Sequence, residues 1–70
     1  MKKETSKEKE AKKYLNKRQI DFVQEYMKTN NINQSAIKAG YSPKTARSQG
    51  SRLLCNVNIR NYIDAITERL

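Results

Sequence analysis

The 70-residue sequence contains no histidine, no tryptophan and a single cysteine. Zinc sites are built from several His and Cys ligands, so these counts exclude a zinc site of the usual kind. Cys55 has no partner for an internal disulfide, as is typical of proteins of the reducing cytoplasm. Because no imidazole is present to activate Cys55, the sequence predicts neither a thiol nucleophile nor a metal or cofactor site.

Long apolar runs are also missing. No stretch approaches the roughly 20 apolar residues that cross a membrane, and the N-terminus lacks the apolar core of a signal peptide. The chain is 36% hydrophobic, and a domain of this size buries only about 60% of the surface its unfolded form exposes. The sequence therefore predicts one small globular domain with a lean core, without a membrane partner.

Acidic residues are absent from the middle of the chain, although the whole sequence has 15 Lys and Arg and 7 Asp and Glu, a net charge of +8. Residues 26–63 contain no carboxylate side chain. A basic surface that only keeps a protein soluble usually mixes both signs, whereas a stretch of one sign repels itself unless a polyanion covers it. This interval therefore favours a nucleic-acid partner. Its cations are Lys28, Lys38, Lys44, Arg47, Arg52 and Arg60.

Residues 1–14 are rich in Lys and Glu and poor in apolar side chains. We expect this segment to bury nothing and to be disordered or a frayed helix. It is either a flexible basic arm that follows phosphates or a solvating tail. The predicted division is a flexible arm over 1–14 and a folded domain over 15–70.

Start and stop patterns predict four helices and no strand, an all-α fold. Asn16 is a good N-cap with Gln19 three residues on, which predicts a helix to about Thr29 and a loop at Asn30–Asn31. A second helix is expected from an N-cap at Asn33 through Ala39, where Gly40 ends it. A third begins at Ser42 with Pro43 in its first position, and a fourth at an N-cap on Asn58.

Apolar stripes at helical spacing give the expected core and three expected hydrophobic staples: Leu15 with Ile20, Ile32 with Ile37, and Val57 with Tyr62. The domain is expected to be a monomer in isolation. The predicted core residues are Ile20, Val23, Met27, Ile37, Leu53, Leu54, Tyr62, Ile63 and Ile66.

The spacing of Ala36, Gly40 and Ala46 is typical of a helix-turn-helix. Such a motif needs a small residue where its two helices cross, a glycine at the sharp turn and a small residue early in the second helix. In that second helix Ala46, Gly50, Leu53 and Leu54 share the inward face.

The opposite face of the second helix holds short hydroxyls between cations. Such a face suits a DNA major groove, where hydroxyls approach base edges or phosphates and Lys or Arg reaches guanine. An ordinary solvated helix face is the alternative, which explains the polarity but not the lack of acids. The predicted DNA-binding residues are Lys38, Ser42, Lys44, Thr45, Arg47, Ser48, Ser51 and Arg52.

Two carboxylate pairs at helical spacing, Asp21 with Glu25 and Asp64 with Glu68, are interpreted as solvated ion pairs rather than catalytic dyads. Basic residues on the same faces favour that interpretation. The four tyrosines are expected mostly in the core, which argues against a stacking platform for single strands. The sequence therefore predicts a protein that is not an enzyme.

The runs RQIDFVQEY (18–26), AIKAGYS (36–42) and ARSQGSRLL (46–54) resemble the N-terminal region of phage terminase small subunits. The resemblance covers residues 15 to 66. It implies a domain that recognises the packaging site on viral double-stranded DNA in the bacterial cytoplasm. It also implies partnership with a large subunit that holds the ATPase and nuclease, and oligomeric rings formed through further regions of the full-length protein.

Two other functions stay open on the residues alone, because a fold does not fix a function. One is a helix-turn-helix transcriptional regulator or a recombinase accessory domain. The other is an interaction module whose basic face binds an acidic protein or RNA.

Overall fold

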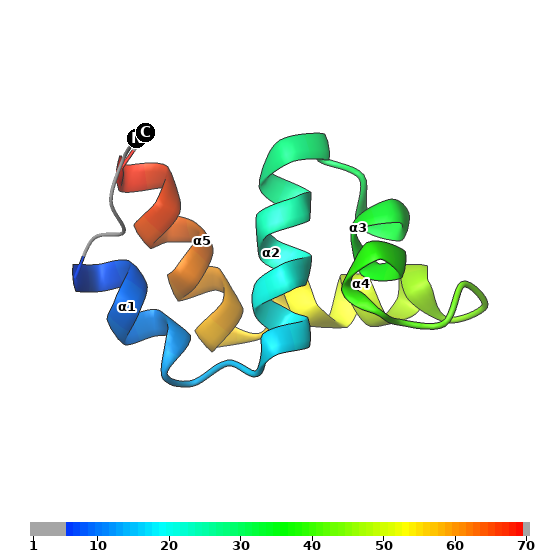
Figure 1. The fold of residues 1–70 in the computed structure, drawn as a ribbon, viewed down its shortest axis with the longest axis horizontal. Coiled ribbons are helices and arrows are strands. Elements are labelled where there is room, and N and C mark those ends of the chain that lie inside the picture. The colour runs from blue at the N-terminus through cyan, green and yellow to red at the C-terminus, as the bar shows by residue number, and fades with distance from the viewer. Residues whose placement is uncertain (1–5, 70) are drawn as a thin grey trace.

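The computed structural model describes residues 6–69, which form five helices and contain no strand (Figure 1). The predicted all-α fold is confirmed, with one helix added before the four expected from the sequence. The helices are α1 (Ser6–Lys12), α2 (Lys17–Thr29), α3 (Ile32–Ala39), α4 (Ala46–Cys55) and α5 (Val57–Arg69).

Helix α2 stands between two pairs of helices (Figure 1). On one side α1 packs along α5, and on the other α3 packs on α4. Helix α4 passes behind α2 in this view and leads directly into α5. Helix α5 contacts α1, α2 and α4, so it joins the two pairs into one core. The turn between α3 and α4 therefore lies at one end of a molecule about 35 Å long, and α1 and α5 lie at the other.

Helix α2 begins as the sequence predicts. The side chain of Asn16 accepts a hydrogen bond from the Gln19 N–H at 2.8 Å, and the Gln19 side chain accepts one from the Asn16 N–H at 3.0 Å. This reciprocal pair satisfies two N–H groups that the helix itself cannot. The helix ends at Asn30, whose φ of 55° is left-handed, in the predicted Asn30–Asn31 loop. The predicted capping box is confirmed.

The N-caps of α3 and α5 lie two residues earlier than predicted. Asn31, not Asn33, caps α3 and accepts from the Gln34 N–H at 3.0 Å. Asn56, not Asn58, opens α5 and accepts from the N–H of Asn58 at 2.8 Å. Each site has the pattern Asn-apolar-Asn, and the first Asn forms the cap in both.

The early cap has a packing reason at α3. It places Ile32 inside the helix, where its side chain lies against the backbone of α4 at Gly50. A cap at Asn33 would leave this contact outside the helix. At α5 the Asn56 carboxamide also accepts from the Ile59 N–H at 3.4 Å, so a single side chain serves two N–H groups.

Helix α4 begins at Ala46, later than the predicted start at Ser42. Residues 43–45 form a turn in which the Ser42 carbonyl accepts from the Thr45 N–H at 3.0 Å. Pro43 therefore occupies the second position of a β-turn, which its fixed φ favours as much as it favours a first helical position. Thr45, with φ −113° and ψ 0°, carries the chain from the turn into the helix.

Part of the lysine-rich segment is ordered, against the expectation that it buries nothing. Residues 6–12 form α1, in which Glu8 is 3% exposed and Ala11 packs against the core. Lys7 Nζ lies 3.1 Å from a Glu68 carboxylate oxygen on α5. The small Ala11 side chain and this cross-helix ion pair let α1 dock on α5. Residues 1–5 and 70 lie outside the described residues, and a division of the chain near residue 14 stays a prediction.

The core agrees with the predicted stripes except at α3 and at the start of α5. Ile37, predicted inside, is 38% exposed, and Val57 is 69% exposed, so the staples predicted for α3 and α5 are wrong. Leu15 and Ile20, the pair predicted at α2, both pack against the core. Phe22 and Ile59 are fully buried, although the predicted core omitted them. Every other predicted core residue is either buried or packed against the core.

Helices α3 and α4 approach each other closely at Gly50. A Cβ at this position would clash with Cγ2 of Ile32, and would lie 3.3 Å from both the Ile32 carbonyl oxygen and Cε1 of Phe22. The added methyl would meet the branched side chain of Ile32, a backbone carbonyl and a buried ring. None of these is the end of a long flexible side chain that could move aside. The distance between α3 and α4 therefore depends on glycine at this position.

Gly50→Ala is expected to destabilise the domain, although alanine is the better helix former by about 1 kcal/mol. The inserted methyl forces α3 and α4 apart, and overpacking of this kind costs about 1–3 kcal/mol. Ser51→Ala, at the neighbouring exposed position, is the control and is expected to leave the melting temperature unchanged or raise it slightly. Thermal denaturation of both variants checks this, and a melting temperature for Gly50→Ala at or above wild type would contradict it.

Candidate nucleic-acid interface

Helices α3 and α4 with the turn 40–45 form the motif that the sequence predicts. Ala36 and Ala46 are 0% exposed, which places both small residues in the interior. Gly40 has a φ of 108°, a left-handed conformation that side-chain-bearing residues rarely adopt. The three predicted positions therefore have the predicted properties: two buried small residues and a glycine at the sharp turn.

The turn is closed by backbone hydrogen bonds at both of its ends. The N–H groups of Gly40 and Tyr41 donate to the carbonyls of Ile37 and Ala36, both at 3.0 Å, which satisfies the last turn of α3. At the other end the Lys44 N–H donates to Ser42 Oγ at 3.4 Å, beside the Ser42–Thr45 backbone bond. In this turn the side chains of residues 42–45 are exposed, whereas Tyr41 is partly buried.

Seven of the eight predicted DNA-binding residues lie on the turn and the outer face of α4, and all seven are exposed. The same helix buries Ala46, Gly50 and Leu53 and half-buries Leu54. The predicted split between inward and outward faces is therefore confirmed, while the contacts of these residues with DNA stay a prediction. The seven residues, called here the α4 face, are Ser42, Lys44, Thr45, Arg47, Ser48, Ser51 and Arg52.

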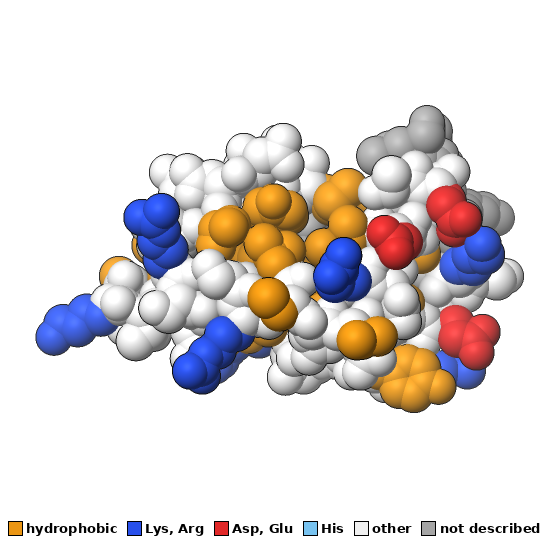
Figure 2. Space-filling view, turned by 180° about the vertical axis from the view of Figure 1, so that it is seen from behind, with side chains coloured by type: hydrophobic (Ala, Val, Ile, Leu, Met, Phe, Trp, Pro, Cys, Tyr) orange, Lys and Arg blue, Asp and Glu red, His pale blue; other side chains and the backbone are white. Residues whose placement is uncertain are grey.

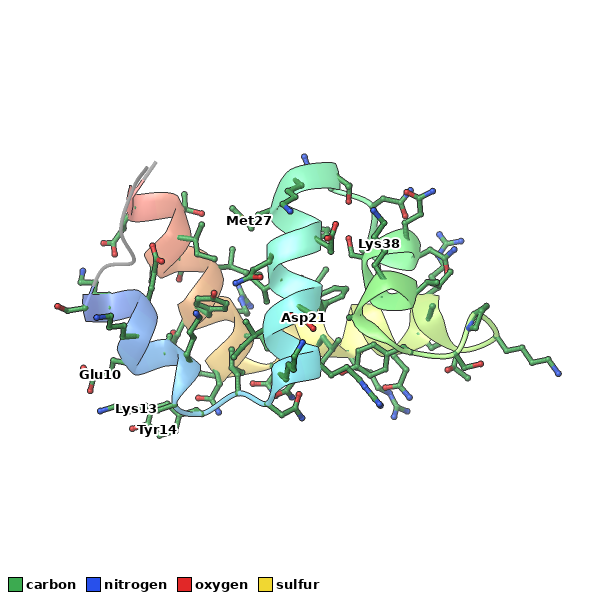
Figure 3. All side chains as sticks on the ribbon, in the orientation of Figure 1. Glu10, Lys13, Tyr14, Asp21, Met27 and Lys38 are labelled. Carbon is green, nitrogen blue, oxygen red and sulfur yellow. The ribbon has the colours of Figure 1, made fainter. Side chains whose placement is uncertain are left out.

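Lys38 is the eighth predicted residue, and the structure sets it apart from the α4 face. Its Nζ lies 3.9 Å from a carboxylate oxygen of Glu25 on α2, and Lys28 lies 4.0 Å from the other oxygen. Figure 3 shows Lys38 on α3, near α2. Glu25 thus balances part of the charge of Lys38, which the sequence could not show because the two are far apart along the chain.

The cations of the α4 face have no such counter-charge. Among residues 6–69, no carboxylate lies within ion-pair distance of Lys44, Arg47 or Arg52. Figure 2 shows basic side chains without acidic neighbours at the end of the molecule that holds the turn, whereas the acidic side chains of that face lie towards the opposite end, with further basic ones among them. The motif therefore carries positive charge that no carboxylate of residues 6–69 pairs with.

Two groups that the sequence did not assign to the site lie next to it. Arg47 borders a surface hollow with Asn30, Asn31, Ile32 and Asn33, so the loop before α3 is a neighbour of the α4 face. No local sequence pattern indicates this proximity, because it follows from the crossing of α3 over α4.

Arg18 of α2 is the second unassigned neighbour. Its Cζ lies 5.3 Å from the ring centre of Tyr41, in a cation–π contact. Burial raises the pKa of the Tyr41 phenol, and the nearby Arg18 charge opposes that rise. The contact brings the beginning of α2 to the turn of the motif.

Other candidates from the sequence have structural explanations. Asp21 pairs with Lys17 at 3.1 Å, as predicted for a solvated helix face. Tyr62 is buried, whereas Tyr14 is 65% exposed and lies on the α1–α2 link, away from the α4 face (Figure 3). Residues 6–69 contain no cluster of three His, Cys, Asp or Glu residues suited to a metal ion. None of the helices over this range has the length and apolarity needed to cross a membrane.

Comparison with known proteins gives one consistent family. The family described as "Terminase small subunit" matches residues 15–70. The chain is 48% identical over 56 residues to the PBSX phage terminase small subunit of Bacillus subtilis (strain 168), a match covering 80% of this chain and 21% of that protein. It is 46% identical over 57 residues to the terminase small subunit of Staphylococcus phage 80alpha, covering 80% and 39%. The chain thus spans between a fifth and two fifths of these relatives. No solved structure matches significantly.

Gly40→Val is expected to destabilise the domain far more than Lys44→Ala. A β-branched residue at φ 108° is strained by roughly 1–2 kcal/mol or more, whereas Lys44 is exposed and makes no ion pair with residues 6–69. Chemical denaturation of the two variants measures the difference in unfolding free energy. Coincident curves would show that the turn does not require glycine.

Proposed function

Because the chain belongs to the terminase small-subunit family, we propose that it binds viral double-stranded DNA at the packaging site and thereby helps to start packaging. In this proposal it acts in the cytoplasm of the bacterial host and carries no catalytic group or cofactor. The ATPase and nuclease belong to a large subunit that it brings to the DNA.

The observation that carries the proposal is the α4 face. It combines hydroxyls with three cations that lack counter-charges among residues 6–69, on a helix whose other side is anchored in the core. An α-helix fits the major groove of B-form DNA, where each base pair presents a distinct pattern of donors and acceptors. A phosphate backbone would supply the missing negative charge.

The α4 face divides into two parts by position. Arg47, Ser48, Ser51 and Arg52 project from α4 itself, and we assign them to the groove, where Arg can donate two hydrogen bonds to guanine. Ser42, Lys44 and Thr45 belong to the turn at the beginning of α4, and we assign them with Lys38 to the phosphates on the groove's edge. Thr45 makes no side-chain hydrogen bond to the first turn of α4, which leaves that positive helix end open to a phosphate.

Assembly and contact with the large subunit are functions of the full-length protein rather than of this domain. We propose that ring assembly and contact with the large subunit use parts of the full-length protein outside the matched segment, and that the isolated domain is a monomer. One domain is expected to bind duplex DNA with a Kd on the order of 10⁻⁴–10⁻⁶ M. Several copies on one DNA would raise the overall affinity through effective concentration.

Lys44→Ala and Arg47→Ala are expected to weaken duplex binding in different ways. Loss of a phosphate contact at Lys44 weakens binding to every sequence and flattens the plot of log affinity against log salt by about one unit. Loss of a guanine contact at Arg47 costs about 1–3 kcal/mol and relaxes preference at one base position. Fluorescence anisotropy with duplex DNA at several salt concentrations measures both.

Arg60→Ala is the matched control for this experiment, because Arg60 is an exposed cation on α5 outside the α4 face. It is expected to change affinity and salt slope little. An NMR titration with the same duplex gives an independent check. Shifts confined to residues 59–69, with residues 42–52 unchanged, would show that α5 rather than α4 meets the DNA.

A further inference from the structure

The turn between α3 and α4 has a single side-chain anchor. Within residues 40–45, Gly40 and residues 42–45 are exposed, and Tyr41 alone is partly buried and packed against the core. Backbone hydrogen bonds set the shape of the turn and connect it to its two helices: to the end of α3, and to α4 through the Thr45 carbonyl, which accepts from the Gln49 N–H at 2.8 Å. None of these bonds reaches α2, so the position of the turn relative to α2 depends on where the Tyr41 ring sits.

Arg18 covers that ring from α2. Its guanidinium carbon lies 5.3 Å from the ring centre, and its Nε lies 3.5 Å from the place a Cβ of Gly40 would occupy. Arg18 thus stacks on Tyr41 and lies beside Gly40, the residue before it. It begins in the first turn of α2, which the Asn16–Gln19 capping box holds in place.

Within residues 6–69, no acidic side chain near Arg18 competes with the Tyr41 ring for its guanidinium group. Arg18 lines a surface hollow with Asn16, Lys17, Asp21 and Tyr41. Lys17 occupies the Asp21 carboxylate at 3.1 Å, and no carboxylate of residues 6–69 lies within ion-pair distance of Arg18. A guanidinium without a carboxylate partner stacks well on an aromatic face.

We propose that Arg18 is a positioning residue for DNA binding: by stacking on Tyr41 it clamps the turn 40–45 to α2 and so fixes Ser42, Lys44 and Thr45 in the place from which they meet phosphates. The inference rests on the proposed function of the α4 face. It extends that function to α2, from which none of the predicted contact residues comes. Arg18 acts through Tyr41, and the DNA does not touch it.

The first test needs no DNA. In Arg18→Gln, the pKa of Tyr41 is expected to rise further, because the cation that opposed the effect of burial is gone. The NMR signal of the labelled Tyr41 ring, followed with pH, measures this shift, and amide hydrogen exchange of residues 41–45 is expected to accelerate. Arg18→Lys, which keeps the charge, is expected to restore most of both readouts. An unchanged Tyr41 titration and unchanged exchange in Arg18→Gln would overturn the proposal.

The second test measures duplex binding of the same variants. A cation–π contact at an exposed site corresponds to a factor of roughly two to five, so Arg18→Gln is expected to bind DNA about two- to fivefold more weakly. The salt slope is expected to stay at its wild-type value, and Arg60→Gln, at an exposed cation of α5, is the control. A slope flattened by about one unit in Arg18→Gln would identify Arg18 as a direct phosphate contact and overturn the positioning role.

The two tests separate this inference from the proposed function. If wild-type protein fails to bind duplex DNA, the proposed function falls and the positioning role in binding falls with it, whatever the Tyr41 titration shows. If wild type binds and Arg18→Gln binds equally well, only the inference about Arg18 is wrong.

Discussion

A single methyl group at Gly50 would collide with Ile32, and this lack of space sets the geometry of the motif. Because α3 and α4 approach so closely, the buried side of α4 is limited to small residues and the leucines that follow them. The same approach brings the N-terminal end of α3 beside Arg47. The outer face of α4 is thus presented on a rigid support, as a helix that enters a groove requires.

The distribution of charge follows from which helices are packed together. Both carboxylates of α2 and Glu68 of α5 meet lysines of their own or neighbouring helices, as in the pairs Asp21–Lys17 and Glu68–Lys7. The α4 face has cations but no acids, so its positive charge remains unbalanced within residues 6–69. This positive charge attracts phosphates and repels acidic surfaces, and both effects act at the end of the molecule that holds the turn.

The sequence predicts best those features that are decided locally. The capping box at Asn16 and the glycine at residue 40 each depend on a few neighbouring residues, and both are found as expected. Predictions fail where a local sequence pattern is equally compatible with two structures. In Asn31-Ile32-Asn33 either Asn can cap a helix, and contact of Ile32 with α4 decides between them. Pro43 likewise suits a β-turn and a helix start equally well.

Features that depend on contacts between distant residues were not predictable. Helix α1 packs on α5, which lies far from it along the chain. The segment itself has too few apolar residues to predict a packed helix. Ile37 has the spacing of a core residue, but α3 packs mainly on α2 and α4, and Ile37 is left 38% exposed. The contact of Arg18 with Tyr41 joins two helices through a turn, and no spacing within either helix reveals it.

The central claim, that α4 lies against duplex DNA, can be tested with the cysteine that the chain already has. Cys55 is exposed at the C-terminal end of α4, so an iron chelate that generates hydroxyl radicals can be attached there without a new mutation. A matched protein, Cys55→Ser with Asn61→Cys, carries the same chelate on the exposed side of α5. The account predicts strand cleavage confined to a few nucleotides from position 55 and little from position 61. Strong cleavage from position 61 with none from position 55 would contradict it.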